Sequence, residues 1–373
     1  MKNGFTLIEL LAVIVILAII ALIAVPIVLN IINDSKESSG LRSAEFYLDA
    51  VEYTIADAFL YHGGLEDKEY PITPDGNICK KALPCDDANI LKVEVNGDKP
   101  TGGSITINGG NISSVELVLD EKTIIKNSKG ELVYLKYLDE VCELVSGTAK
   151  TASAKYECKV DPNKEAYTFY VLTTPSATDT NINLIMDRNI NSDGSPTTKV
   201  ITEANKNNNG GVYNIVPWIT KENYLTLGGT EDNWNNWVDN NKFGPITAMN
   251  FLSKATKNWT NTNELIVDTF IDDTGKSHNM KTYNTYARMP YRSEVNDSSK
   301  IWLINCLHGL DDEMVGIVGI ECSISNIYGY WTASNDQFYF KNAWCVYMYG
   351  GVKSQYVEDY SEIGVRPVIN LKI

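Results

Sequence analysis

The sequence has 373 residues, with 32 Lys and Arg against 47 Asp and Glu, so its formal net charge is −15. This acidic balance argues against a nucleic-acid-binding protein, because such proteins present a basic face to phosphates. Hydrophobic residues make up 44% of the chain, which is enough for real cores and excludes wholesale disorder. Within residues 1–32 the charged residues are Lys2 and Glu9 alone. An apolar segment therefore precedes an acidic body, which disfavours a purely cytosolic enzyme.

The apolar segment runs from Leu10 to Leu29, 20 residues without a charge. A helix of that length crosses the ~30 Å hydrocarbon core of a membrane, whereas a lone strand would leave its backbone unpaired in lipid. A secretory signal has a shorter apolar core and a small-residue cleavage site, which Ala24-Val25-Pro26 matches poorly. The sequence therefore predicts a membrane helix, with Pro26 bending or loosening it.

The residues in front of this segment carry the most specific pattern. Gly4 directly precedes Phe5, and Glu9 stands five positions after Gly4 where the apolar run begins. This arrangement resembles the type IV prepilin (class III) signal. The resemblance implies that residues 1–4 are a leader, that a membrane peptidase cuts between Gly4 and Phe5, and that it methylates the new N-terminal Phe5. The transmembrane and polymerisation helix, residues 5–32, then stays on the mature protein, and the resemblance implies local melting near Pro26 on assembly.

Glu9 has two interpretations. A carboxylate at the edge of a membrane is costly unless it is paired, and after cleavage the Phe5 amine is a positive charge four residues upstream. Glu9 could pair with that amine in its own chain or in a neighbour. The alternative is a charge in the first helical turn, stabilised by the helix dipole and reaching the headgroups. The signal in which Glu9 stands favours the first interpretation.

Beyond Asn30, apolar residues recur at helical spacing, and Gly63-Gly64 follows as a helix end. A helix from Phe5 to His62 would be ~87 Å long. Residues 65–89 are predicted to be loop, followed by four strands, with hairpin turns at Asn96-Gly97 and at 108–111. The strands are expected at Leu91–Val95, Ser104–Ile107, Val115–Leu119 and Leu132–Leu135. The fold class is thus α+β, with a pilin-like domain at residues 33–164 whose small antiparallel sheet packs on the long helix.

Residues 165–373 are predicted to form a separate α+β domain. Strands are expected at Tyr167–Leu172, Ile182–Met186, Leu265–Val267, Tyr330–Thr332, Ala343–Tyr349 and Val365–Leu371, with a helix at Ile246–Trp259. Trp302, Trp331 and Trp344 are expected in the core. Sequences such as Gly329-Tyr330-Trp331-Thr332 and Asn342-Ala343-Trp344, with residues 364–369, resemble surface domains related to the C-type lectin and formylglycine-generating-enzyme fold. That resemblance implies a fold more than an activity.

Motifs for catalysis or metal binding are not found. Asn189-x-Asn191-x-Asp193-Gly194 resembles part of a calcium loop, but Val200 stands where the bidentate acid belongs, which favours a solvated loop. His62, His278 and His308 share no ligand spacing, and the sequence has no phosphate loop or nucleophile elbow. We therefore expect no metal and no cofactor, and no enzymatic activity.

The seven cysteines fall into sequence-near pairs that suggest disulfides in an exported protein. The pairs are Cys79 with Cys85, Cys142 with Cys158, and Cys306 with Cys322, which leaves Cys345. Cys142–Cys158 is the most credible, at the end of the pilin-like domain. Reduced, buried thiols are the alternative.

The sequence as a whole predicts a structural subunit of a type IV pilus-like filament, as a large or minor pilin that displays a C-terminal adhesion or binding domain. Its expected partners are copies of itself and other pilins, a prepilin peptidase and methylase, the pilus assembly platform and the membrane. The subunit would span the membrane once before assembly and reach the cell surface afterwards. The alternatives are a pseudopilin of a type II secretion or competence system, and a membrane-anchored surface binding protein or enzyme that does not polymerise.

Overall fold

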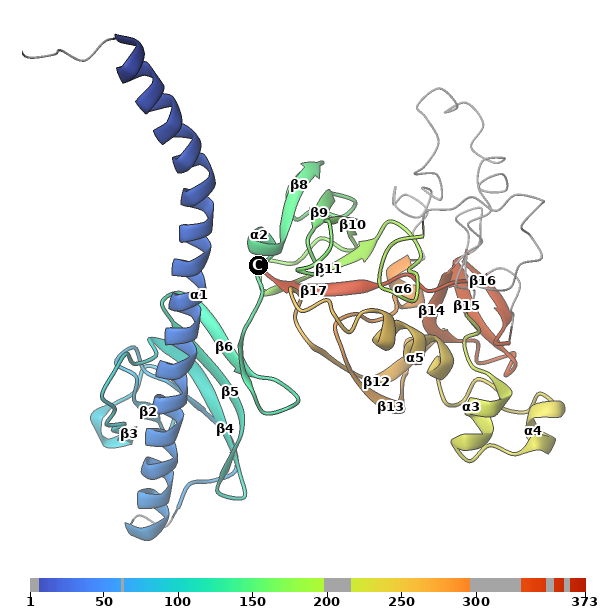
Figure 1. Cartoon of the computed structure of the whole chain (residues 1–373). Helices are drawn as coiled ribbons and strands as arrows, with labels where there is room; N and C mark the ends of the chain where they lie inside the picture. The colour runs from blue at the N-terminus through green and yellow to red at the C-terminus, as the bar shows by residue number, and fades with distance from the viewer. Residues whose placement is uncertain (1–6, 62–63, 198–215, 296–329, 347–351, 359–362) are drawn as a thin grey trace, which may run out of the picture. The chain divides into compact units, whose positions relative to one another are not determined.

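The fold comes from a computed structural model that describes residues 7–61, 64–197, 216–295, 330–346, 352–358 and 363–373, with only some side chains between residues 7 and 34. The chain divides into two compact units, Met1–Leu135 and Lys136–Ile373. Both mix helix and sheet, and the elements are labelled in Figure 1. The fold class is therefore mixed α+β, with a helix near the N-terminus and several sheets.

The first unit is built on one long helix, α1 (Leu7–Tyr61), of 55 residues. Every described residue of the predicted span, from Leu7 to Tyr61, is helical, and this part is ~83 Å long. It ends where Gly64 adopts φ +85°, and the Gly64 N–H donates to the Ala58 carbonyl oxygen at 3.0 Å. Glycine adopts this left-handed backbone without steric cost, which explains the helix end.

A five-stranded antiparallel sheet covers one face of the C-terminal half of α1. Its order is β1-β4-β5-β6-β7, and its strands are β1 (Glu69–Pro71), β4 (Gly102–Asn108), β5 (Asn111–Leu119), β6 (Lys122–Lys126) and β7 (Leu132–Tyr134). The shared core is formed from α1 by Ala44, Tyr47, Leu48, Val51 and Ile55, and from the sheet chiefly by Ile105, Ile107, Val115, Leu117 and Ile124. The α1 residues recur three and four apart, so that they lie on one face of the helix.

The predicted strand at Leu91–Val95 is wrong. The structure has two-residue strands β2 (Ile78–Cys79) and β3 (Ile90–Leu91), which pair with each other after the 3₁₀ turn Asp87–Asn89. Side chains bind the backbone of Val93 instead: Asn77 Oδ1 accepts from its N–H at 3.0 Å, and Lys99 Nζ donates to its carbonyl oxygen at 2.6 Å. Residues 92–100 therefore form no strand, and Asn96-Gly97 is not a hairpin turn.

Two hairpin turns flank β5. The predicted turn at residues 108–111 is confirmed, with Gly109 and Gly110 both at positive φ and Asn108 paired with Asn111. The turn between β5 and β6 is made by Asp120 (φ 48°) and Glu121 (φ 66°). Adjacent Asp and Glu residues do not indicate a hairpin turn in the way that Asn-Gly or Gly-Gly does, so the sequence did not predict this turn or the strand β6 that follows it. The predicted loop at 65–89 likewise contains β1, which pairs with β4.

The second unit holds two five-stranded sheets. One is antiparallel, in the order β17-β11-β10-β9-β8, and the other has the order β13-β12-β14-β15-β16 with β12 and β14 parallel. The first comprises β8 (Cys142–Ser146), β9 (Lys155–Cys158), β10 (Tyr167–Val171), β11 (Asn181–Met186) and β17 (Val368–Lys372). The second comprises β12 (Leu265–Asp272), β13 (Ser277–Thr285), β14 (Tyr330–Asn335), β15 (Asn342–Val346) and β16 (Val352–Tyr356). The helices among the described residues of this unit are α2 (Leu138–Val141), α3 (Lys221–Thr226), α4 (Glu231–Asn235), α5 (Ile246–Ala255) and α6 (Arg292–Val295).

The division between the units lies at Leu135/Lys136, not at the predicted 164/165. The reason is strand pairing: β8 pairs with β9, β9 pairs with β10, and Ala154, Tyr156 and Cys158 belong to the core of the second unit. Residues 136–164 are thus part of the second unit.

Tryptophans anchor the core of the second unit. Trp218, Trp259 and Trp331 are fully buried. The indole N–H of Trp218 donates to the Thr332 carbonyl oxygen at 2.9 Å, and the indole N–H of Trp331 donates to the Val216 carbonyl oxygen at 2.7 Å. Of the three tryptophans expected in the core, Trp331 is confirmed, Trp344 is half-buried under Arg292 (3.9 Å to the ring centroid), and Trp302 lies outside the described residues.

The candidate assembly helix and its surroundings

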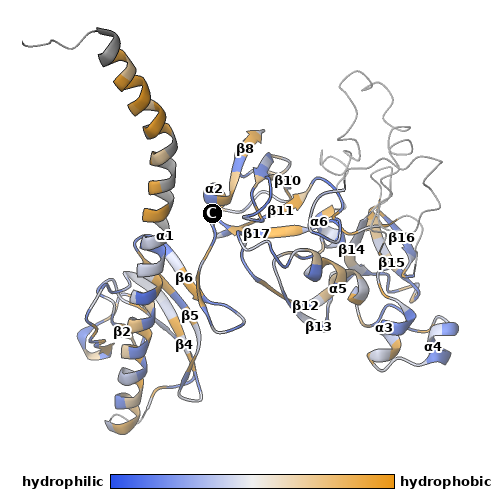
Figure 2. Ribbon diagram, viewed as in Figure 1, coloured by the Kyte–Doolittle hydropathy of each residue, from blue (hydrophilic) through white to orange (hydrophobic). Residues whose placement is uncertain are grey.

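The N-terminal half of α1 presents apolar side chains to solvent. In Figure 2, most of the coloured part of this half is in the orange of hydrophobic residues. Of the side chains that the structure describes in this half, thirteen large aliphatic ones are exposed: Leu11, Val13, Ile14, Val15, Ile16, Leu17, Ile19, Ile20, Leu22, Val25, Val28, Ile31 and Ile32. Since full burial of one such side chain is worth about 1.5–3 kcal/mol, this half of the helix favours an apolar environment or a partner. Within the part of the chain that the structure describes, no helix is both long and apolar enough to cross a membrane.

The sequence-predicted processing and assembly residues lie at the start of this helix. Gly4 and Phe5 fall outside the described residues. Glu9 is the third residue of α1, and the helix continues through Pro26 as one element.

The helix leaves its sheet near Gly40. An added Cβ at Gly40 would lie 1.9 Å from the Tyr134 hydroxyl oxygen, so glycine lets β7 approach the helix closely. One turn earlier, Glu37 pairs with Lys122 at 3.1 Å, and Lys122 also lies over the Tyr134 ring. These contacts fix the end of the sheet-covered half, beyond which α1 has no sheet beside it in its own unit.

A groove of about 710 Å³ runs along the other face of the sheet-covered half. It is lined by Phe46, Asp49, Ala50, Tyr53, Thr54, Asp57, Lys92, Glu94, Val95 and Asn96. The aromatic rings of Phe46 and Tyr53 are exposed, whereas the residues on the sheet-facing side of the helix, such as Tyr47 and Val51, are buried. This part of α1 therefore offers a second surface, aromatic and acidic, which the helical spacing of the apolar residues alone did not reveal.

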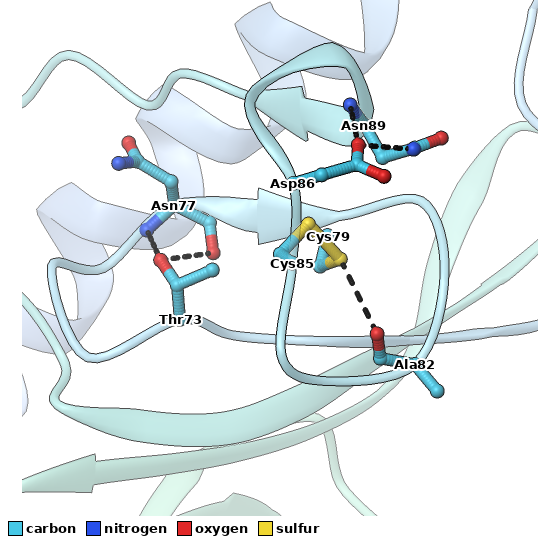
Figure 3. The surroundings of a disulfide bond; sticks show 7 residues. All are labelled: Thr73, Asn77, Cys79, Ala82, Cys85, Asp86 and Asn89. Atoms are coloured by element: carbon cyan, nitrogen blue, oxygen red, sulfur yellow. Dashed lines mark hydrogen bonds between the residues drawn. A yellow bond between two sulfur atoms is a disulfide. The ribbon is translucent and has the colours of Figure 1, made fainter.

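A disulfide between Cys79 and Cys85 closes the loop beside the sheet of the first unit (Figure 3). Cys79 is fully buried, and its Sγ lies 4.0 Å from the Ala82 carbonyl oxygen. Thr73 Oγ1 accepts from the Asn77 N–H at 3.0 Å on one side of the disulfide, and Asp86 Oδ1 accepts from the Asn89 N–H at 3.1 Å on the other. The disulfide and these side-chain caps hold a segment that has little strand structure of its own.

The second predicted pair, Cys142 with Cys158, is also a disulfide and joins facing residues of β8 and β9. It therefore lies in the second unit rather than at the end of the pilin-like domain. Cys306 and Cys322 lie outside the described residues, and Cys345 is buried with its Sγ 3.4 Å from the Lys353 carbonyl oxygen.

The loop that resembles a calcium site is occupied by the protein's own groups. Asp193 accepts from the Ser195 hydroxyl at 2.6 Å and from Lys164 Nζ at 2.9 Å. The Ser195 hydrogen bond and, after it, Lys164 lower the pKa of Asp193 to about 2, against the opposing effect of burial. Asn191 Nδ2 donates to the Ser195 hydroxyl and to the Pro196 carbonyl oxygen. Among the described residues, no group of three or more His, Cys, Asp or Glu side chains could hold a metal ion.

Of the three histidines, only His278 lies among the described residues, and it forms a pair with Asp272 that the sequence did not predict. His278 Nε2 lies 2.8 Å from Asp272 Oδ2, and its ring stacks on Phe270. Asp272 Oδ1 accepts from the Thr274 hydroxyl and from the N–H groups of Thr274 and Lys276. Burial raises the pKa of Asp272, but the hydrogen bonds from His278, Thr274 and Lys276 outweigh it and hold the pKa well below its usual range. The pair closes the β12–β13 hairpin and is part of its structure.

The comparison with protein families decides the nature of the N-terminus. Residues 1–25 match the family model of the prokaryotic N-terminal methylation motif. The chain begins with a type IV pilin-like prepilin signal. The signal supports a type IV pilin-like or pseudopilin protein, and it implies processing by a prepilin peptidase and assembly with pilins. No curated protein and no solved structure matches the chain, so the lectin-like resemblance of residues 165–373 gains no support.

Proposed function

We propose that the protein is a large or minor subunit of a type IV pilus-like filament, processed between Gly4 and Phe5 and assembled through α1. The observation that carries this proposal is the continuity of the prepilin signal, residues 1–25, with a 55-residue helix. Exposed aliphatic side chains of that helix are described from Leu11 onward, two residues after Glu9 in the sequence. A signal that directs processing thus leads into a surface suited to burial against other helices.

The two halves of α1 have different roles in this proposal. The apolar half holds the precursor in the membrane and then packs among the same segments of other subunits. The other half carries the sheet on one face and the groove with Phe46 and Tyr53 on the other, so a neighbouring helix can contact it without displacing the sheet.

The second unit serves as the displayed part of the subunit, with a binding or adhesive role rather than a catalytic one. Support comes from its own core of buried tryptophans and from its own two sheets. Two carboxylates with clearly lowered pKa values, Asp193 and Asp272, bind other side chains of the unit. Asp193 binds Lys164 and Ser195, and Asp272 binds Thr274 and His278.

The test is cross-linking in filaments sheared from cells. A photo-reactive amino acid at Leu17, in the exposed apolar half of α1, should give a ladder of cross-linked subunits in the sheared fraction. The same probe at Ile266, an exposed residue of β12, is the control and should give far fewer subunit–subunit products. A protein that stays monomeric and in the membrane fraction at every expression level would show a display anchor instead.

A further inference from the structure

The second unit carries a cluster of exposed aromatic side chains that the proposed function does not use. Three of them, Phe338, Tyr339 and Phe340, are consecutive in the turn between β14 and β15, and they are 75%, 61% and 49% exposed. Trp237, after α4, is 53% exposed, and Tyr356 at the end of β16 is also exposed. These five residues are called the aromatic tip below. Aromatic side chains of this size are normally buried, so a group of them in water marks a contact surface.

Hydrogen bonds join the segments of the aromatic tip. The Asn241 N–H donates to the Phe340 carbonyl oxygen at 2.9 Å, and Asn241 Nδ2 donates to the carbonyl oxygens of Asp336 at 2.9 Å and Asn342 at 2.7 Å. Lys341 Nζ lies 4.0 Å from the ring centroid of Trp237 and 4.4 Å from that of Tyr356. The residues after α4 and the β14–β15 turn therefore form one surface.

The turn is built to be rigid although its side chains are exposed. Asp336 is buried, and its Oδ1 accepts from the N–H groups of Phe338 at 2.9 Å and Tyr339 at 3.1 Å. The Asn342 N–H donates to the Tyr339 carbonyl oxygen at 2.7 Å, which closes the turn. Three consecutive exposed side chains therefore project from a closed turn, and the buried Asp336 and Asn241 hold its backbone.

Trp237 is held in an unfavourable backbone conformation. Its φ is 56°, and the Val238 N–H donates to the Asn233 carbonyl oxygen at 3.0 Å. Trp237 thus occupies the left-handed position after a helix end, where glycine is preferred because a bulky side chain there is strained. Retaining tryptophan at this position places its indole in the aromatic tip at a cost to the stability of the fold.

We infer that the aromatic tip is a membrane-contact surface that inserts into the interface of a lipid bilayer. Phenylalanine side chains exposed on a turn, with tryptophan, tyrosine and lysine beside them, have the composition of side chains that enter a membrane interface. Two nearby cations are engaged within the unit, since Lys242 pairs with Asp239 at 2.5 Å and Lys341 lies against two aromatic rings. The surface is therefore suited to zwitterionic lipid rather than to a strongly anionic bilayer, which the net charge of −15 would oppose.

A sugar or a protein fits this surface less well. The ring faces of Trp237 and Tyr356 that would stack on a sugar are partly covered by the Lys341 ammonium. A protein partner would have to match the positions of these exposed rings, whereas a fluid bilayer accommodates them. The inference concerns the second unit alone and does not depend on filament assembly.

The test uses the full chain held in lipid nanodiscs, so that the N-terminal helix is already occupied, and adds phosphatidylcholine vesicles. Vesicles with brominated acyl chains should quench the tryptophan fluorescence, and the quenching should be absent from Trp237→Phe. The nanodiscs should also float with the vesicles. Phe338→Ser should weaken this co-flotation about tenfold, as expected for one large apolar side chain, whereas Ile266→Ser on β12 should leave it unchanged.

Trp237→Gly separates contact from folding. Glycine relieves the left-handed backbone, so this variant should unfold at the same or a higher temperature than the wild type and yet float less with the vesicles. Wild-type protein that neither floats with the vesicles nor is quenched would overturn the inference. Co-flotation that survives Phe338→Ser and Trp237→Gly would place the lipid contact elsewhere, and binding of the aromatic tip to a protein or a soluble glycan, without vesicle binding, would identify a different partner.

Discussion

Gly103 shows how a single position fixes the sheet of the first unit. Its φ is +111°, and an added Cβ would lie 2.0 Å from the Glu116 carbonyl oxygen on the paired strand β5. We expect Gly103→Ala to lower the free energy of unfolding by about 1–3 kcal/mol, because both the backbone and the strand spacing must change. Its neighbour Gly102 has no atom within 4 Å of an added Cβ.

Gly102→Ala is therefore the matched control and should change the free energy of unfolding by less than about 0.5 kcal/mol. Thermal or denaturant unfolding of the full chain in detergent measures both variants. Equal stability of the two would mean that the close approach of β4 and β5 at Gly103 is wrong.

Substitution of Glu9 distinguishes a filament subunit from a simple membrane anchor. If Glu9 pairs with the Phe5 amine of a neighbour, Glu9→Ala should insert and be cleaved normally, since removing a charge beside an apolar run eases insertion. Incorporation into sheared filaments should fall about tenfold or more, because a charge-assisted contact in a low-dielectric setting is lost. Glu9→Gln keeps the shape without the charge and should fail nearly as much.

Comparison of the sheared and membrane fractions of each variant measures this effect. Wild-type amounts of Glu9→Ala in filaments would make Glu9 only a charge at the helix terminus.

At the scale of elements, the β12–β13 hairpin depends on one carboxylate. The pKa of Asp272 is lowered in the folded protein, so its stabilising contribution is full above its unfolded pKa, about 3.9, and is lost as the pH falls through the lower folded value. We expect Asp272→Asn to cost about 1.5–3 kcal/mol at pH 7, the usual worth of hydrogen bonds to a charged group. The difference from the wild type should shrink below about pH 4.

Unfolding temperatures between pH 7 and pH 2 measure this dependence. Asp268→Asn, on the exposed side of the same strand, is the control and should follow the wild type. A constant gap between Asp272→Asn and the wild type at all pH values would show that the charge of Asp272 is not what stabilises the hairpin.

The sequence predicted elements best where their pattern is local and long. The span of α1 was accessible because an uncharged apolar run of 20 residues leads into apolar positions at helical spacing beyond Asn30. The turn at Gly109-Gly110 was accessible because glycine adopts that backbone easily. Strand β6 was missed because Asp120 and Glu121 adopt a conformation that they rarely signal. The Asp272–His278 pair and the aromatic tip were missed because they depend on strand pairing and on side-chain exposure, which no local pattern reveals.

At the scale of the whole molecule, the boundary between the two units has a direct consequence. Residues 136–373 contain both sheets of the second unit. The two ends of this segment lie together, because the Lys372 N–H donates to the Lys136 carbonyl oxygen at 3.0 Å. A fragment of residues 136–373 should therefore unfold cooperatively on its own. A fragment of residues 165–373 should not, because it lacks β8, β9 and the buried side chains of Ala154, Tyr156 and Cys158.

Denaturant unfolding followed by tryptophan fluorescence compares the two fragments. Cooperative unfolding of residues 165–373 with the same midpoint would show that residues 136–164 are a linker and not part of the unit. Loss of cooperativity in both fragments would mean that the second unit needs the first in order to fold.

The boundary could not be predicted from the sequence because a disulfide between Cys142 and Cys158 is equally compatible with the end of the first domain and with the start of the second. The disulfide joins β8 to β9, and the pairing of β9 with β10 assigns both strands to the second unit. By contrast, the processing signal is a local pattern of Gly4, Phe5 and Glu9 and needs no tertiary structure to be recognised.

The central claim is that the precursor is processed at Gly4–Phe5 and that the processed chain is what assembles. The most direct measurement is mass spectrometry of the N-terminal peptide of the protein recovered from sheared filaments. The account predicts a peptide that begins with N-methylated Phe5 and lacks residues 1–4, and it predicts no such product when Gly4→Leu blocks the peptidase. An N-terminal peptide that begins at Met1, or one created by cleavage after Ala24, would contradict the account.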